Sequence, residues 1–216
     1  MSMILRIYKF SDASLETVKN NDKILSCLSF IESEDDGMQV FKMMKDGLTN
    51  IPENIPEEFK LQYRKSVDEA ELKVRFAKDL KKRELKLVEE IRNRSISLEK
   101  NWHGIAFLLT GEAYDEISLL GKSVFGETAV GDDLGYGPAK LLTRERIMEI
   151  RKDLSEITED DFISRYDSEL MNTLQIYPGG WELNENREIL LESFRQFVSF
   201  FSDAAAGGYN LIYTMT

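Results

Sequence analysis

The sequence predicts an α+β fold: a predominantly helical single domain with a small sheet formed by its N- and C-terminal strands. Three observations favour this class. Branched and aromatic residues dominate both ends of the chain, over 3–10 and 209–215. Strong helix formers, with apolar residues at helical spacing, fill most of the chain between these ends. The 216 residues are 42% hydrophobic and 31% charged, which is typical of a globular chain that buries its own core.

The N-terminal quarter is expected to hold one strand followed by helices. Ser11 and Asp12 directly follow the apolar strand segment, and both residue types favour the first position of a helix. Pro52 and Pro56 mark the clearest internal loop, because proline interrupts regular structure. The expected elements are, in order, a strand at 3–10, helices near 14–20 and over 23–31, an acidic turn at 32–37 and a loop at 50–57.

A long charged helical segment is expected next. The stretch 58–100 contains no Gly or Pro, and its apolar residues recur at four- and seven-residue steps. We expect an amphipathic helix or a bent pair, with 58–96 as an elaboration within a single domain over 1–216. Either one face packs on the rest of the domain, or the segment projects as a partner-binding arm. The apolar positions are Leu72, Phe76, Leu80, Leu87 and Ile91.

The C-terminal half is expected to alternate helices with strands. Thr143 is a helix cap, and Thr158 with Asp161 has the spacing of a capping box. Gly207 and Gly208 are expected to end the last helix. The expected elements are a third strand at 139–142, helices over 144–154, 158–166 and 183–206, and a final strand at 209–215.

The charge balance limits the classes of partner. Formal net charge is −11, and a field of that sign repels nucleic-acid phosphates, so no nucleic-acid binding is expected. The stretch 64–101 differs, because twelve basic and eight acidic residues give it +4, which leaves −15 on the remainder. The opening residues do not have the pattern of a signal peptide, and no apolar run approaches 18 residues. A cytoplasmic location without membrane binding is therefore expected.

No motif for catalysis or metal binding is complete. His103 and Cys27 are the single residues of their types, which removes the standard zinc ligand sets. The apolar neighbours of Cys27 predict a buried thiol. The segment 121–123 resembles the end of a phosphate-binding loop, but Glu116 occupies the position that requires glycine. A calcium-loop pattern that starts at Glu32 fails because Met43 stands where a bidentate Glu is required. The sequence predicts no metal and no cofactor.

Two glycine-rich loops are the most distinctive local features. Seven of the thirteen glycines lie between 104 and 137, and the loops 135–138 and 177–181 each place aromatic residues beside Gly and Pro. Such loops either present their rings to a ligand or tuck them into the core. A catalytic triad of Ser123, His103 and Asp115 is not supported, because the residues around Ser123 lack the spacing of a nucleophile elbow. The candidate ligand-binding residues are Trp102, His103, Asp132, Asp133, Tyr136, Tyr177 and Trp181.

These loops also carry a family resemblance. The chain resembles the YfbM-like bacterial family, a family of domains of unknown function, over about 1–35 and 98–216. Where that family commonly has Arg-Tyr-Leu-Thr after Gly-Tyr-Gly-Pro-Ala, this chain has Lys-Leu-Leu-Thr at 140–143. The resemblance implies a single α+β domain in a bacterial cytoplasm and brings no activity, cofactor or catalytic residue. The matching segments are the strand at Met3-Ile4, Lys100–Gly111, Asp132–Thr143 and Met171–Trp181.

Two interpretations of function follow. The first is a non-enzymatic protein-binding module, of inhibitor or immunity type, that recognises a basic protein through its acidic surface. The alternative is a small-molecule-binding domain or enzyme with a pocket at the Gly135–Pro138 and Tyr177–Trp181 loops. In that case His103, Asp132 and Asp133 are the acid–base candidates. The incomplete motifs favour the first interpretation, and the oligomeric state stays open.

Overall fold

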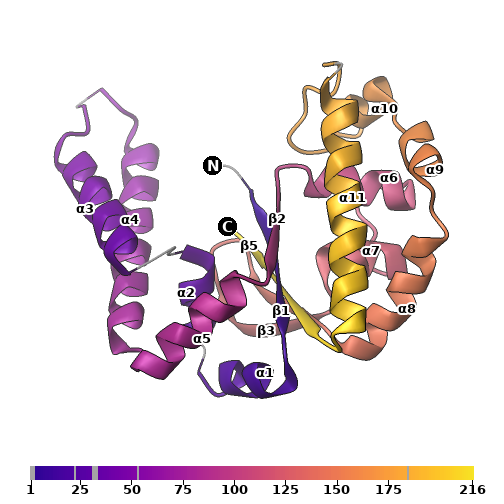
Figure 1. The fold of residues 1–216 in the computed structure, drawn as a ribbon. Helices are drawn as coiled ribbons and strands as arrows, with labels where there is room; N and C mark the ends of the chain where they lie inside the picture. The colour runs from indigo at the N-terminus through magenta and orange to yellow at the C-terminus, as the bar shows by residue number, and fades with distance from the viewer. Residues whose placement is uncertain (1–2, 22, 31–33, 53, 184) are drawn as a thin grey trace. The chain divides into compact units, whose positions relative to one another are not determined.

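The computed structural model describes residues 3–21, 23–30, 34–52, 54–183 and 185–216. The chain divides into two compact units, one made of residues 1–16 and 93–216 and the other of residues 17–92 (Figure 1). The predicted class is confirmed, because the described residues form a predominantly helical α+β fold with a small antiparallel sheet. The predicted boundaries, one domain over 1–216 with an elaboration at 58–96, stay a prediction.

The larger unit contains a five-stranded sheet in the order β2-β1-β5-β4-β3, in which every neighbouring pair is antiparallel. The two terminal strands pair directly, from Leu5 opposite Met215 to Phe10 opposite Asn210. The predicted sheet of N- and C-terminal strands is thereby confirmed, as is the third strand. The strands are β1 (Leu5–Phe10), β2 (Ser95–Glu99), β3 (Thr128–Asp133), β4 (Pro138–Leu142) and β5 (Asn210–Met215).

The helices of this unit begin where the sequence places capping residues. The Thr143 hydroxyl accepts a hydrogen bond from the Arg146 N–H, and Thr158 and Asp161 form the predicted capping box. Helix α1 (Asp12–Lys19) crosses the division between the two units. The other helices are α6 (Trp102–Thr110), α7 (Leu119–Phe125), α8 (Arg144–Ser155), α9 (Glu159–Ser164), α10 (Ser168–Thr173) and α11 (Glu185–Ala206).

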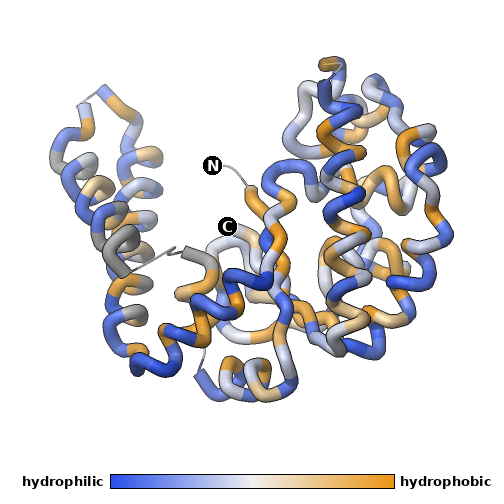
Figure 2. Tube along the Cα trace, viewed as in Figure 1, coloured by the Kyte–Doolittle hydropathy of each residue, from blue (hydrophilic) through white to orange (hydrophobic). Residues whose placement is uncertain are grey.

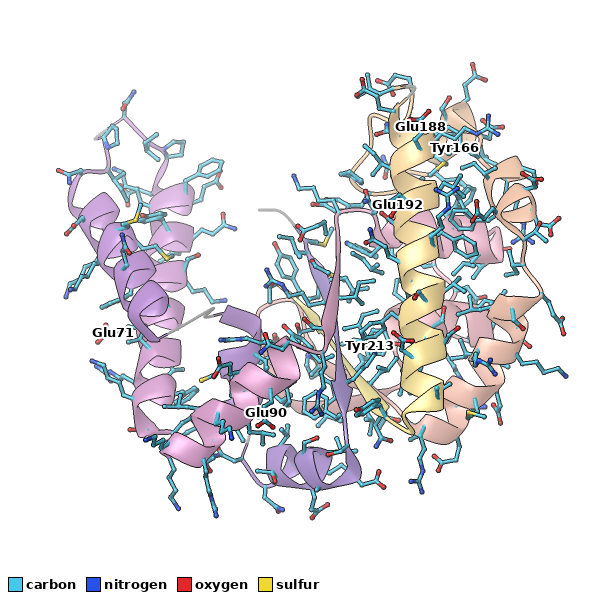
Figure 3. All side chains as sticks on the ribbon, viewed as in Figure 1. Glu71, Glu90, Tyr166, Glu188, Glu192 and Tyr213 are labelled. Carbon is cyan, nitrogen blue, oxygen red and sulfur yellow. The ribbon has the colours of Figure 1, made fainter. Side chains whose placement is uncertain are left out.

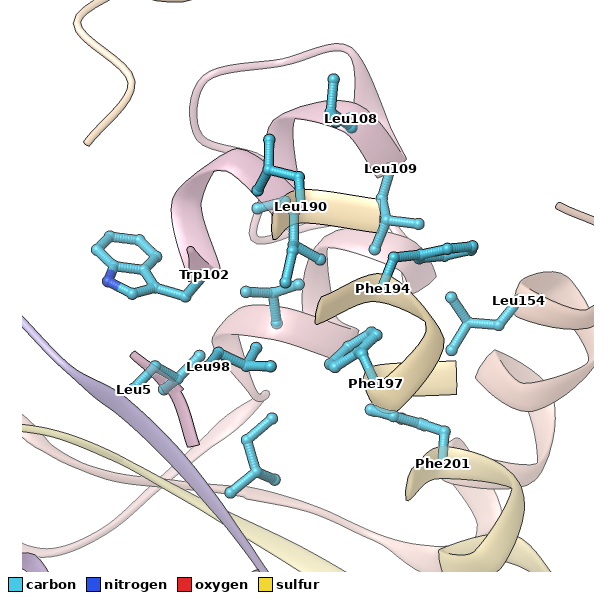
Figure 4. Packing of buried hydrophobic residues seen from close by; sticks show 14 of the residues in the cluster. Leu5, Leu98, Trp102, Leu108, Leu109, Leu154, Leu190, Phe194, Phe197 and Phe201 are labelled. Atoms are coloured by element: carbon cyan, nitrogen blue, oxygen red, sulfur yellow. The ribbon is translucent and has the colours of Figure 1, made fainter. Parts of the chain in front are cut away.

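Helix α11 supplies one wall of the core. Hydrophilic and hydrophobic residues alternate along it (Figure 2), so that one face is apolar. Phe194, Phe197 and Phe201 on that face point into the buried cluster that α6 and the sheet complete (Figure 4). Tyr213 on β5 (Figure 3) lies in the same core, where its hydroxyl donates to the Ser123 carbonyl at 2.9 Å. The core therefore fixes α6 and α7 against one face of the sheet.

The smaller unit is helical. The Tyr63 hydroxyl of α4 donates to the Met44 carbonyl of α3 at 3.0 Å, and Lys23 on α2 pairs with Asp79 at the end of α4 at 2.7 Å. Cys27 is buried as predicted, and burial raises the pKa of its thiol to about 11, so the thiol is protonated at neutral pH. The helices are α2 (Lys23–Phe30), α3 (Glu34–Thr49), α4 (Glu57–Asp79) and α5 (Lys82–Arg92).

Four sequence expectations require correction. The long segment is the bent pair α4 and α5, but it ends at Arg92, and 95–99 forms strand β2 beside β1. Strand β3 was not expected at all. The prediction of an acidic turn at 32–37 is wrong over 34–37, because these residues begin α3. Acidic residues favour a helix N-terminus. The rest of that stretch lies outside the described residues. Leu72 is exposed, because it lies opposite the buried positions of α4.

Thr214 on β5 carries a buried polar group that gains nothing from burial. The residue is 1% exposed, and within the described residues its hydroxyl oxygen has no hydrogen-bond partner. A Thr214→Val change keeps the shape and removes the unpaired hydroxyl, so we expect about 1 kcal/mol of added stability. Thermal denaturation should then show a melting temperature about 2–4 °C above the wild type. A lower melting temperature for Thr214→Val would contradict this account; Thr214→Ser, which keeps the hydroxyl, is the control.

Candidate functional site

An aromatic cluster surrounds the single histidine at the start of α6. The His103 ring stacks on Trp102 at a centroid distance of 4.9 Å, and the tilted Tyr114 ring lies 4.5 Å from it. Trp102 also stacks on Tyr177 at 5.8 Å and meets the edge of Phe125 at 6.1 Å. The structure thus brings together three of the candidate residues, Trp102, His103 and Tyr177, from segments about 75 residues apart in sequence.

Both ring nitrogens of His103 are engaged by the backbone. The Tyr177 N–H donates to Nδ1 at 2.9 Å, so Nδ1 is unprotonated, and Nε2–H donates to the Ala113 carbonyl at 2.6 Å. The side chain is completely buried, and burial lowers the pKa of the imidazole, an effect that the bond to Ala113 partly opposes. His103 is therefore a neutral imidazole that ties the 177–181 loop to α6 and to the segment after it.

Trp181 closes the same loop from the inside. Its indole N–H donates to the Ile176 carbonyl at 2.7 Å, and its ring lies against Gly104. A Cβ atom at Gly104 would lie 2.8 Å from the Trp181 ring, so glycine is required for this close packing. The Tyr166 hydroxyl donates to the Trp181 carbonyl. Trp181 therefore belongs to the packing around α6.

The other three candidates lie together on the β3–β4 turn. The Asp133 carboxylate accepts hydrogen bonds from the N–H groups of Gly135 at 2.7 Å and Gly137 at 3.0 Å. Both glycines have positive φ angles, +118° and +99°, which glycine adopts without strain. Asp132 is exposed, and the Tyr136 side chain is 43% exposed. Asp133 thus orders a turn that leaves the Tyr136 ring partly in solvent.

The seven candidates therefore form two groups with different surroundings. In the first group, the bond from the Tyr177 N–H to His103 connects the 177–181 loop with α6, whereas in the second the Asp133 carboxylate accepts from two N–H groups of the β3–β4 turn. Ser123, His103 and Asp115 do not form a catalytic triad, since the Ser123 hydroxyl donates to the Leu120 carbonyl. Among the described residues, no three His, Cys, Asp or Glu side chains are grouped so that they could hold a metal ion. The ligand-binding role of the seven residues stays a prediction.

An exposed apolar loop that the sequence did not reveal lies beside the aromatic cluster. Residues 111–118 connect α6 to α7. Ile117 is 88% exposed and Tyr114 is 67% exposed, although both side chains are large and apolar. The Asp115 carboxylate accepts hydrogen bonds from the N–H groups of Ile117 and Ser118, both at 2.9 Å. The hydrogen bond from the Ser118 hydroxyl, followed by these two N–H bonds, lowers the pKa of Asp115, so the carboxylate stays charged and holds the loop.

Ion pairs attach this region to the sheet. Glu116 of the loop pairs with Lys140 on β4 at 3.1 Å. Glu127, directly before β3, receives Lys122 from α7 at 2.7 Å and both Arg146 Nε at 3.2 Å and Nη2 at 3.3 Å from α8. The hydrogen bond from Lys122, followed by those from Arg146, lowers the pKa of Glu127. These charges position the loop, α7 and β3 with respect to one another.

The architecture defines a class of protein: a predominantly helical α+β protein whose terminal strands pair within a five-stranded antiparallel sheet. The family model of the Domain of unknown function (DUF1877) matches residues 1–214, and the chain belongs to this family. The resemblance stated from the sequence is thereby confirmed.

Among solved structures, the chain is similar to the crystal structure of a protein of unknown function, YfbM from Escherichia coli. The TM-score is 0.56 at 12% sequence identity, and the match covers 99% of each chain. At this identity the similarity shows the fold alone. No curated protein matches the chain. The helices of the described residues include none that is both long and apolar enough to span a bilayer.

Proposed function

We propose that the chain is a non-enzymatic protein-binding module, of inhibitor or immunity type, that contacts its partner through Tyr114 and Ile117. The exposure of Ile117 on an ordered loop is the observation that carries this proposal. Large side chains that become buried at the centre of an interface contribute most of the binding energy. Because Asp115 and the Glu116–Lys140 ion pair already hold the loop, little conformational entropy remains to be lost on binding.

The charge around the loop favours a basic partner. Glu112, Asp115 and Glu116 lie within a stretch of five residues, and the chain as a whole carries −11. Acidic surfaces accelerate association with basic proteins and repel acidic ones. A basic toxin or nuclease held by its inhibitor fits this pattern. The expected interface is thus an apolar centre, Ile117 and Tyr114, with an acidic rim.

The surroundings of His103 support a module without catalysis. An acid–base residue needs a ring nitrogen that faces a substrate, but both nitrogens here bond to the backbone of the same chain. The rings of Trp102 and Tyr114 also lie against the imidazole, with centroid distances of 4.9 Å and 4.5 Å. The imidazole therefore serves the packing of α6, and the surface outside it is offered to a partner.

The proposal is tested by capture from a native lysate of the source organism with purified bait, at low and at high salt. We expect the wild type to retain one basic protein at low salt and to release it at high salt, because screening weakens complementary charges. An Ile117→Asp bait should retain at least tenfold less of it, since the change puts a charge at the centre of the interface.

The matched control is Ile189→Asp, which makes the same change at an exposed position on α11. This bait should capture the partner as the wild type does. Equal capture by all three baits, or capture that does not respond to salt, would count against the proposal.

A further inference from the structure

Strand β3 is an edge of the sheet with little side-chain cover. It pairs with β4 alone in the strand order, from Thr128 opposite Leu141 to Asp133 opposite Pro138. Five of its six residues are exposed, and Val130 is half-buried. An edge strand directs alternate N–H and C=O groups away from its single neighbour, so it is a template for a further strand. Neither Pro nor Lys, the residues that commonly protect such an edge, occurs within Thr128–Asp133.

Two features of β3 limit what can pair with it. The register is irregular between Val130 and Asp133, which confines regular pairing to the stretch from Thr128 to Val130. Asp132 and Asp133 then follow at the end of the strand. Self-pairing of two copies would bring four carboxylates into one short interface, and like charges opposite one another are destabilising. The same carboxylates attract a strand that carries Lys or Arg.

The edge lies next to the apolar loop of the proposed function. Glu116 pairs with Lys140 on β4, and Lys140 is the cross-strand partner of Ala129 on β3. The loop that carries Ile117 is therefore held beside the strand that neighbours β3.

We propose that an extended segment of the partner, bearing Lys or Arg, adds to β3 as a sixth strand of the sheet. Backbone hydrogen bonds to Thr128–Val130 supply affinity without regard to sequence, and Asp132 and Asp133 select for basic side chains. This inference rests on the proposed function and names the kind of segment that the module recognises.

A labelled decapeptide of alternating Lys and Val tests the inference. Fluorescence anisotropy measures its affinity, and hydrogen exchange reports protection of the individual β3 amides. We expect exchange over 128–130 to slow at least tenfold when the peptide binds. A matched Glu–Val peptide, and a Lys–Val peptide with proline at two central positions, should each bind at least tenfold more weakly. The first lacks the charge, and the second lacks backbone donors.

Charge variants on the protein separate the edge from general attraction to an acidic chain. Asp132→Lys should weaken binding of the Lys–Val peptide at least fivefold. Asp160→Lys, an equal change at an exposed position on α9, should alter it less than twofold. Equal effects of the two variants, or binding that leaves exchange over 128–130 unchanged, overturn the inference. A dimer in sedimentation velocity whose β3 amides are protected without peptide also overturns it, since the occupant is then a second copy.

The two proposals fail separately. If Ile117→Asp abolishes capture but the peptide does not protect β3, the edge-strand inference falls and the proposed function stands. If the peptide protects the β3 amides but the Ile117→Asp bait captures as much partner as the wild type, the apolar loop is not the binding surface. The β3 edge then stands as a strand-binding site.

Discussion

A Gly121→Ala variant is expected to lose about 3 kcal/mol of stability, although alanine is the better helix former. Gly121 lies in α7. At an exposed position within a helix, a Gly→Ala change stabilises the fold by up to about 1 kcal/mol. Here a Cβ atom would lie 1.7 Å from the Asp115 carbonyl oxygen, which is backbone and cannot rotate away. Either α7 or the 111–118 loop must move, and both are held by the Ser118 hydroxyl, which accepts from the Gly121 N–H.

Thermal denaturation measures this effect directly. A loss of 3 kcal/mol corresponds to a melting temperature lowered by about 6–12 °C in a chain of this length. Gly111→Ala is the control, because Gly111 has a φ of +78° but no atom within 4 Å of its Cβ position. Backbone strain alone should cost the control about 1 kcal/mol. If Gly121→Ala melts at or above the wild-type temperature, the close approach of the loop to α7 is wrong.

The same glycine links stability to the proposed binding surface. The close approach at Gly121 lets the loop lie against α7, and Asp115 then orders the backbone that presents Ile117. A displaced loop loses this order even where the chain still folds. We therefore expect the folded fraction of Gly121→Ala to capture less partner than the wild type, whereas Gly111→Ala keeps its capture.

Local signals in the sequence predicted much of the fold. Thr143 and the Thr158–Asp161 pair act through residues three positions away, so their spacing alone locates the starts of α8 and α9. The apolar face of α11 was also predictable, because its buried residues recur at helical spacing in the sequence. Strands β2 and β3 are short edge strands that the sequence did not reveal: β2 pairs with the distant β1, whereas β3 pairs with β4, the next strand along the chain. The helix-forming residues before β2 and the glycine within β3 obscure the alternation of apolar and polar residues by which a strand is recognised.

The site was predictable only in its residue types. The sequence singled out Trp102, His103 and Tyr177, and the structure brings these three together. It could not show that the backbone of Ala113 and of Tyr177 occupies both ring nitrogens, because these bonds depend on tertiary structure. Nor could it show that Ile117 is exposed, since an apolar residue before a helix is usually buried.

Replacing His103 by alanine is expected to cost about 3 kcal/mol at pH 7.5. The change leaves a cavity beside Trp102 and deprives the Tyr177 N–H and the Ala113 carbonyl of their buried partner. Tyr136→Ala should cost less than about 1 kcal/mol, because that ring is partly in solvent. Chemical denaturation of both variants distinguishes a structural His103 from one that only awaits a ligand, for which His103→Ala would fold as stably as the wild type.

The deficit of His103→Ala is also expected to shrink as pH falls from 7.5 to 5. Burial lowers the pKa of His103 in the folded chain, whereas the unfolded chain titrates near the ordinary 6.5. Below pH 6.5 the unfolded wild type therefore binds a proton that the folded state excludes, and its free energy of unfolding falls by up to about 1.4 kcal/mol per pH unit. The alanine variant has no imidazole to take up this proton. Its free energy of unfolding therefore depends less on pH and approaches the wild-type value as pH falls. Tyr136→Ala retains His103 and should follow the wild-type slope; parallel curves for all three chains would mean that His103 is protonated equally in the folded and unfolded states.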